Sequence, residues 1–208
     1  NTGLAIIYNG HRILSRNGLV DLLNDNMTAT GLYPIIHLKG EDIEVVITHS
    51  NQYGEEYYSF VNGQHTTQGG THLSAFKESV GRVIKEYYNK NFEYSDIRAG
   101  IVAAISIKVE EPVFESQTKT KLGNSEVKGI VESLVNEKLT EYLEENPSTA
   151  KKIITKAVEA ARVRDAAKRA RDLARSKSSL FDGTLPGKLA DCQSSKPEEK
   201  ELFLVEGD

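Results

Sequence analysis

Apolar residues recur along this chain with two different spacings. Short apolar runs, alternating or continuous, are typical of strands, and an Asn9-Gly10 pair between the first two predicts a hairpin turn. We expect the hairpin to be followed by an antiparallel sheet. The predicted strands of the first part of the chain are 4–8, 12–14, 33–38, 43–48 and 56–61.

Spacings of three and four residues predict four helices. The first is short, from Leu19 to about Asn26, and the second follows Thr71 as its N-cap and carries apolar residues to Tyr87. A third apolar stripe covers 125–144. Asn146-Pro147 then predicts an N-cap and first turn for a long helix over 148–177.

A strongly apolar run at 100–109 predicts a central strand, which Pro112 ends because proline cannot donate to a ladder. A polar loop, 115–124, follows it with Gln117 and Lys119 near its tip. This loop is the first candidate for a binding element.

Gly69-Gly70 precedes the second helix and allows two interpretations. Glycines before a helix can let its N-terminus hold a phosphate, or they can permit a tight turn from strand to helix. We favour the tight turn, because the strong phosphate motifs contain more glycines or a P-loop lysine.

Composition excludes several protein classes. The single cysteine, Cys192, cannot form an internal disulfide, which suits a reducing, cytoplasmic compartment. No apolar run is long enough for a membrane span. The five histidines lack metal-ligand spacing, and no nucleophilic triad is recognisable. The formal net charge of −4 hides a basic stretch over 162–177, which is either a solvated arm or a surface for nucleic acid.

Several motifs, in order along the chain, resemble the B subunit of bacterial type IIA topoisomerases, the ATPase subunit of DNA gyrase and topoisomerase IV. The run Glu111 to Leu122, with Gln117-Thr118-Lys119, resembles the switch loop of that family. The other matching segments are 60–62, 69–72, 96–100, 160–162, 185–192 and 201–208.

The resemblance implies an α+β fold: a mixed β-sheet with helices on one face, a left-handed βαβ crossover and a long C-terminal helix. Residues 1–180 would form the transducer domain, 181–199 a linker, and 200–208 the first strand of a truncated TOPRIM domain. We therefore expect the chain to be part of a longer protein whose ATPase domain precedes Asn1.

By the same resemblance, Gln117 and Lys119 would contact the ATP γ-phosphate, and Glu206 would bind Mg²⁺ and act in DNA strand cleavage. Asp208 belongs to the same motif. Both the ATP site and the Mg²⁺ site would be incomplete in this chain, which alone should be inactive. The implied DNA-facing residues are Arg162, Arg164, Lys168, Arg169, Arg171 and Arg175.

The resemblance also implies partners: DNA, the topoisomerase A subunit in an A2B2 heterotetramer, a second B subunit on ATP binding, and no membrane. The function would be to couple ATP binding and hydrolysis to DNA strand passage. An alternative is a non-catalytic RNA- or ribosome-binding domain of similar fold, which would not need Gln117 and Lys119. A small-molecule kinase is disfavoured because a longer glycine-rich loop is absent. Between gyrase and topoisomerase IV, the amino-acid sequence of residues 63–67 slightly favours topoisomerase IV.

Overall fold

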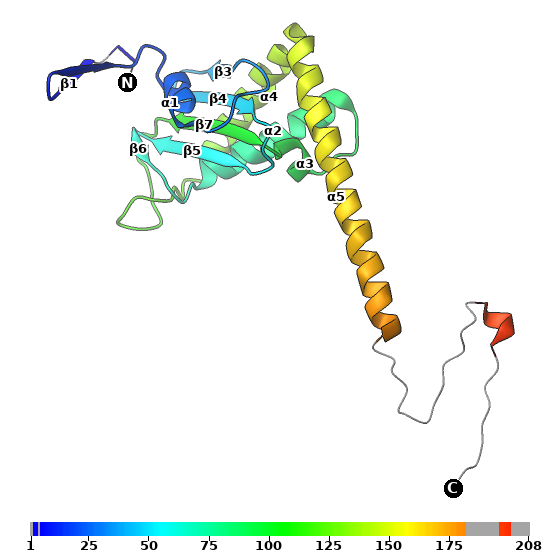
Figure 1. Cartoon of the computed structure of the whole chain (residues 1–208). Coiled ribbons are helices and arrows are strands. Elements are labelled where there is room, and N and C mark those ends of the chain that lie inside the picture. The colour runs from blue at the N-terminus through cyan, green and yellow to red at the C-terminus, as the bar shows by residue number, and fades with distance from the viewer. Residues whose placement is uncertain (1, 4, 182–195, 201–208) are drawn as a thin grey trace. The chain divides into compact units, whose positions relative to one another are not determined.

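A five-stranded sheet is the centre of the fold (Figure 1), seen here in a computed structural model that describes residues 2, 3, 5–181 and 196–200. Its strands lie in the order β3-β4-β7-β5-β6. They are β3 (Ile36–Lys39), β4 (Ile43–His49), β5 (Glu56–Val61), β6 (Gln64–His65) and β7 (Ile101–Ile107). The helices are α1 (Leu19–Asn26), α2 (Thr71–Tyr88), α3 (Tyr94–Arg98), α4 (Val127–Glu145), α5 (Pro147–Phe181) and the short 3-10 helix η1 (Pro197–Glu199).

The sheet is mixed, as the resemblance implies. Strand β4 is antiparallel to β3 and β7, whereas β5 lies parallel to β7. The expectation of an antiparallel sheet in the first half of the chain is confirmed for β3 and β4 but wrong for β5, which pairs in parallel with β7. The reason is that β4 and β5 do not pair with each other: β7, the most apolar strand, lies between them and is buried along nearly its whole length. The parallel pair β5 and β7, connected through α2 and α3, forms the βαβ unit, and its left-handedness stays a prediction.

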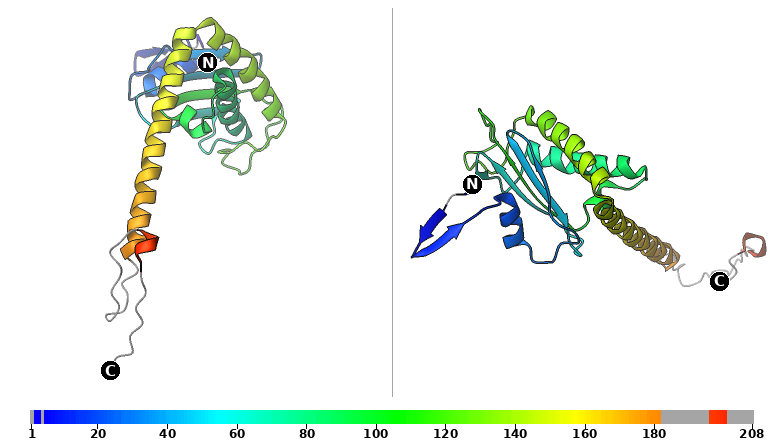
Figure 2. Two further views of the ribbon diagram at one scale, coloured as in Figure 1. Left: turned by 90° about the vertical axis from the view of Figure 1, so that its right-hand side faces the viewer. Right: turned by 90° about the horizontal axis from the view of Figure 1, so that it is seen from above.

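Helices cover both faces of the sheet (Figure 2, right), so the expectation of helices on one face is wrong. On one face, α2 and α4 pack over residues such as Val45 and Ile105 in the main core. On the other, Leu23 of α1 packs against Val46 and Val102. The physical reason lies in β4 and β7, whose consecutive apolar residues present a buried side chain to each face.

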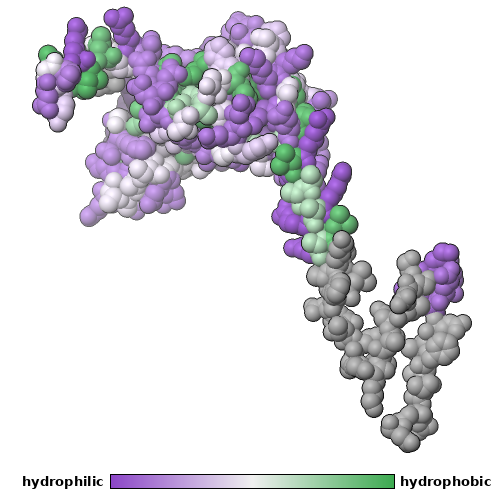
Figure 3. Space-filling view, in the orientation of Figure 1, coloured by the Kyte–Doolittle hydropathy of each residue, from purple (hydrophilic) through white to green (hydrophobic). Residues whose placement is uncertain are grey.

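The hairpin of β1 (Ala5–Tyr8) and β2 (His11–Leu14) is confirmed as a separate two-stranded sheet. Asn9 and Gly10 both have positive φ, at 48° and 78°, as a tight hairpin turn requires. Large apolar side chains on it are exposed, and Figure 3 shows green surface among purple on this hairpin. They are Ile6, Ile7, Tyr8 and Ile13.

The predicted helix boundaries agree closely with the structure, with one error. Thr71 is the first residue of α2 and Gly70 occupies the N-cap position, so Thr71 is not the cap. At the α4–α5 junction, the side-chain amide of Asn146 donates to the carbonyl of Tyr142, 3.0 Å away. The Asn146 carbonyl accepts from Ala150 at 3.0 Å. Asn146 thus ends one helix and begins the next, and Pro147 opens α5 as expected.

Contacts divide the chain into two units, Asn1–Val163 and Arg164–Asp208, and the division falls inside α5. Helix α5 extends to Phe181, slightly beyond the predicted 177. The predictions for 182–195 and 201–208, which include most of the linker and the TOPRIM strand, lie outside the described residues. Among the helices that are described, none is long and apolar enough to cross a membrane.

Candidate functional site: the loop at 113–123

The predicted switch loop folds as a narrow hairpin. Phe114 and Leu122 form an antiparallel bridge, and the Glu115 amide donates to the Lys121 carbonyl at 3.0 Å. At the base, the Gly123 amide donates to the carbonyl of Val113 at 2.8 Å. The loop is therefore ordered by its own backbone hydrogen bonds and presents a defined tip.

The base of this hairpin is bonded to the start of α2. The Leu122 amide donates to the Gly69 carbonyl, and the Leu122 carbonyl accepts from the Thr71 amide, both at 3.1 Å. A further bond of 2.9 Å runs from the Gln68 amide to the Thr120 carbonyl. Leu122 itself is completely buried. The loop and the N-terminus of α2 thus form one hydrogen-bonded unit.

Gly70 makes this close approach possible. Its φ is 134°, and a Cβ built on it would lie 2.4 Å from the Leu122 carbonyl oxygen and 2.5 Å from the Leu122 amide nitrogen. The Thr71 amide, which a phosphate at the helix start would need, is already bonded to Leu122. The Gly69-Gly70 pair therefore serves a tight backbone packing, which confirms the turn interpretation.

Gln117 and Lys119 both lie exposed at the tip, as expected. The Lys119 amide closes the turn with a 3.1 Å bond to the Ser116 carbonyl, and Lys119 adopts a left-handed φ of 55°. A lysine in this region is strained, and such strain is common at functional sites.

The two lysines of the loop differ in their partners. Lys121 forms an ion pair with Glu115, with 2.9 Å between Nζ and the carboxylate oxygen. Within the described residues, no acidic group lies within ion-pair distance of Lys119. Its ammonium is thus available to an external anion, whereas that of Lys121 is neutralised by its own loop.

Asn124 holds the two ends of the loop together and was not among the site residues predicted from the sequence. Its side-chain oxygen accepts from the Val113 amide at 2.6 Å, and its amide group donates to the Glu111 carbonyl at 3.1 Å and to Glu126. The bond from Asn124 lowers the pKa of the Glu126 carboxyl. An asparagine just before a helix was the available signal for such a role.

The six basic residues assigned to DNA lie on α5 and are exposed or half-exposed. At 3.6 residues per turn, Arg164, Lys168, Arg171 and Arg175 share one face of the helix, whereas Arg162 and Arg169 lie on the opposite side. The structure therefore separates a four-residue basic stripe from two other arginines.

Among the described residues, the remaining candidates do not form a second site. Glu206 and Asp208 lie outside the described residues. In the described part of the chain, no group of three His, Cys, Asp or Glu side chains could hold a metal ion. His72 is buried and contacts Thr66, whereas His65 is exposed and stacks on Phe60 at 5.0 Å.

Comparison with known proteins identifies the family. The family model for DNA gyrase B matches residues 16–173. The DNA gyrase B subunit of Clostridium acetobutylicum is 45% identical over 203 residues, which cover 91% of this chain and 32% of that protein. The Haloferax volcanii gyrase B subunit is 47% identical over 202 residues, with the same coverage of 91% and 32%. The chain thus spans about a third of the length of these curated relatives.

Solved structures with similar folds come from the same group of proteins. The 43K ATPase domain of Thermus thermophilus gyrase B matches with a TM-score of 0.73 and 31% identity, covering 82% of this chain and 51% of that one. The topoisomerase IV ATP-binding domain of Francisella tularensis matches with a TM-score of 0.60 and 28% identity, covering 74% and 45%. The relatives above are named gyrase, so they do not favour the topoisomerase IV assignment. The matched family model covers more than half of the chain, which therefore belongs to the DNA gyrase B family.

Proposed function

We propose that this chain is the transducer region of an ATP-dependent type IIA topoisomerase and that Lys119, with Gln117 beside it, binds the terminal phosphate of ATP. The observation that supports this is the exposed Lys119 ammonium, left without an ion-pair partner in the described residues, at the tip of a hairpin whose base is bonded to α2. The donors fit the group: an ammonium and a carboxamide both donate to phosphate oxygens.

Such a loop would distinguish ATP from ADP. A cation that contacts only the γ-phosphate contributes binding energy to the ATP-bound state and none after hydrolysis, so it shifts a conformational equilibrium. Movement of the tip would reach the helices through Leu122, whose backbone bonds join the loop to the start of α2. Helix α2 packs in turn against α4 in the main core.

The activity of the whole subunit is part of the proposal, because the chain spans about a third of its curated relatives. We infer a cytoplasmic enzyme that passes one DNA segment through another together with an A subunit and a second B subunit. Glu206 stays a predicted Mg²⁺ ligand and catalytic residue. No set of described residues fits the metal, so we derive no catalytic step from it.

The basic stripe of α5 supports a DNA contact. Arg164, Lys168, Arg171 and Arg175 would face the phosphate backbone and bind it in a salt-dependent, sequence-independent way. An RNA- or ribosome-binding module would use the same charges, but it leaves the strained Lys119 without a role.

ATP turnover by the full-length subunit tests the proposal. We expect Lys119→Ala to lower the rate about 100-fold, the usual effect of removing one preorganised group that stabilises developing charge. Lys121→Ala is the matched control, because Lys121 is already paired with Glu115 in the same loop. Equal turnover in the two variants, with both folded, would contradict the assignment of Lys119.

A further inference from the structure

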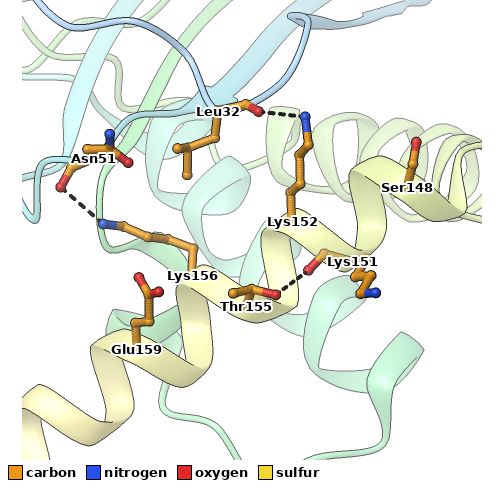
Figure 4. Close-up of a pocket in the computed structure, with 8 residues that line it drawn as sticks. All are labelled: Leu32, Asn51, Ser148, Lys151, Lys152, Thr155, Lys156 and Glu159. Carbon is orange, nitrogen blue, oxygen red and sulfur yellow. Dashed lines mark hydrogen bonds between the residues drawn. The ribbon is translucent and has the colours of Figure 1, made fainter.

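A pocket of about 530 Å³ lies beside the first turns of α5, within the unit that ends at Val163 (Figure 4). Its volume is within the range of small-molecule sites, roughly 300–1,000 Å³. Eight residues line it: Leu32, Asn51, Ser148, Lys151, Lys152, Thr155, Lys156 and Glu159. None of them belongs to the loop at 113–123 or to the basic stripe.

Lysines dominate the charge of this pocket. Three of the lining residues are lysines, and Glu159 is the single carboxylate among them. No carboxylate of the described residues lies within ion-pair distance of Lys152 or Lys156. The lining therefore carries an excess of positive charge that its own side chains do not balance.

Lys156 is the central cation. It is only 5% exposed, and its Nζ donates to the Asn51 carbonyl at 3.2 Å and lies 4.4 Å from the centre of the Tyr53 ring. An ammonium has three N–H donors, and the carbonyl uses one of them. A buried cation is also poorly screened, so an anion beside it is bound more strongly than at an open surface.

Lys152 is the second lysine of the pocket whose ammonium group is held by a backbone carbonyl. Its Nζ donates to the Leu32 carbonyl at 3.0 Å, and Figure 4 shows Lys152 and Lys156 extending from α5 toward the two carbonyls on the far side of the pocket. Two ammonium groups are thus held in place by neutral acceptors. If these lysines served only to cover the core with their aliphatic carbons, no cavity would be required between them.

We propose that this pocket binds a phosphate group, held by Lys152 and Lys156, at a position separate from the Lys119 loop. The neutral carbonyls orient the two ammonium groups and leave their charge for the ligand. Phosphate is the class of anion that fits, because it can accept from several lysine donors at once. A phosphate of this kind occurs in free nucleotides and in the DNA backbone.

Titration of the 208-residue chain with inorganic pyrophosphate tests the proposal. Saturable shifts of the backbone amide NMR signals are expected at 148–159 and near Asn51. We expect Lys156→Met to raise the Kd at least about tenfold, because it removes a buried charge-assisted contact and keeps the stem. Lys90→Met, an exposed lysine outside the pocket, should bind like the unchanged chain.

A second variant keeps the test informative if Lys156→Met does not fold. Glu159→Gln removes the one lining carboxylate and should tighten pyrophosphate binding about threefold through lost repulsion. Lys119→Ala should leave these shifts unchanged, so failure of the γ-phosphate proposal would not affect this result. Absence of saturable shifts at 148–159, or equal affinity in all variants, would overturn the phosphate site.

Two further titrations identify the source of the phosphate. ATP and a short DNA duplex are compared at the same amide signals in about 0.1 M salt, where surface charges are largely screened. Tighter binding of ATP would assign the pocket to a free nucleotide, and tighter binding of the duplex would assign it to the DNA backbone. If neither ATP nor the duplex shifts these signals, the result would count against the proposal, even if pyrophosphate binds at 148–159.

Discussion

Gly70 packs directly against the backbone of Leu122, so closely that a Cβ on Gly70 would lie 2.4 Å from the Leu122 carbonyl oxygen. The two residues form a parallel bridge, although they are far apart along the chain. This contact joins the base of the 113–123 loop to the start of α2, so the position of the loop tip depends on it.

Replacing Gly70 by alanine should therefore destabilise the protein and displace the loop. The new Cβ would contact backbone atoms that cannot move aside, and φ at this position is 134°, which side chains rarely adopt. We expect a loss of about 3 kcal/mol or more in the free energy of unfolding, measured by urea denaturation. Amide NMR shifts should concentrate at 113–123.

Gly129→Ala is the matched control and carries a prediction of its own. Gly129 lies inside α4, and a Cβ at this position would have nothing within 4 Å of it. Alanine should raise the free energy of unfolding by up to about 1 kcal/mol, because it restricts the unfolded chain and favours the helix. Destabilisation of equal size in both variants would contradict the specific role of Gly70.

Two buried histidines predict sensitivity to acid. Burial lowers the pKa of both His49 and His72 to about 4, and the charge of Lys156 adds to the effect on His49. Burial outweighs the opposite effect of the Ile97 carbonyl, which accepts from His49 Nε2–H at 2.9 Å, and the Nδ1 of the neutral ring accepts from the Tyr33 hydroxyl. As the pH falls, these histidines are therefore protonated in the unfolded chain before they are protonated in the folded protein.

Stability from these groups is fully present above pH 6.5 and falls as the pH drops from 6.5 toward 4. We expect each histidine to lower the free energy of unfolding by about 2 kcal/mol at about pH 5 relative to about pH 7. Urea unfolding at the two pH values measures this difference. His72→Gln should reduce it by about half, and an unchanged pH dependence in that variant would show that His72 does not titrate as described.

The basic stripe predicts an asymmetry in DNA binding around α5. The double change Lys168→Gln and Arg171→Gln removes two charges from the stripe, and Arg162→Gln with Arg169→Gln removes two from the opposite side. We expect the first pair to lower the slope of log Kd against log salt by about 2, since each lost phosphate contact contributes about 0.9. Equal slopes for the two pairs would contradict a one-sided contact.

Local periodicity was enough to predict most elements of this fold. Helix α1 and the hairpin follow from apolar spacing and the Asn9-Gly10 turn, and Asn146-Pro147 marks the start of α5. The order of the strands could not be predicted in this way. Placement of β7 between β4 and β5 depends on pairing between distant segments, which no local pattern records.

The contacts within the candidate site could not be predicted from local sequence patterns either. The resemblance located Gln117 and Lys119, but the sequence alone does not show that Glu115 neutralises Lys121 and leaves Lys119 without a carboxylate in the described structure. Nor does it show that Gly70 packs on Leu122, because the contact exists only after the loop folds back onto α2. Leu122, the single apolar residue of the predicted polar loop 115–124, was the signal that this base is buried.

The central claim is that Lys119 senses the γ-phosphate, and the ratio of two affinities tests it most directly. The full-length subunit is titrated with a non-hydrolysable ATP analogue and with ADP, for the unchanged protein, Lys119→Ala and Lys121→Ala. We predict that Lys119→Ala reduces the preference for the ATP analogue at least about tenfold, with ADP affinity unchanged, as expected for one lost charge-assisted contact. A preference that is the same in all three proteins would contradict the account.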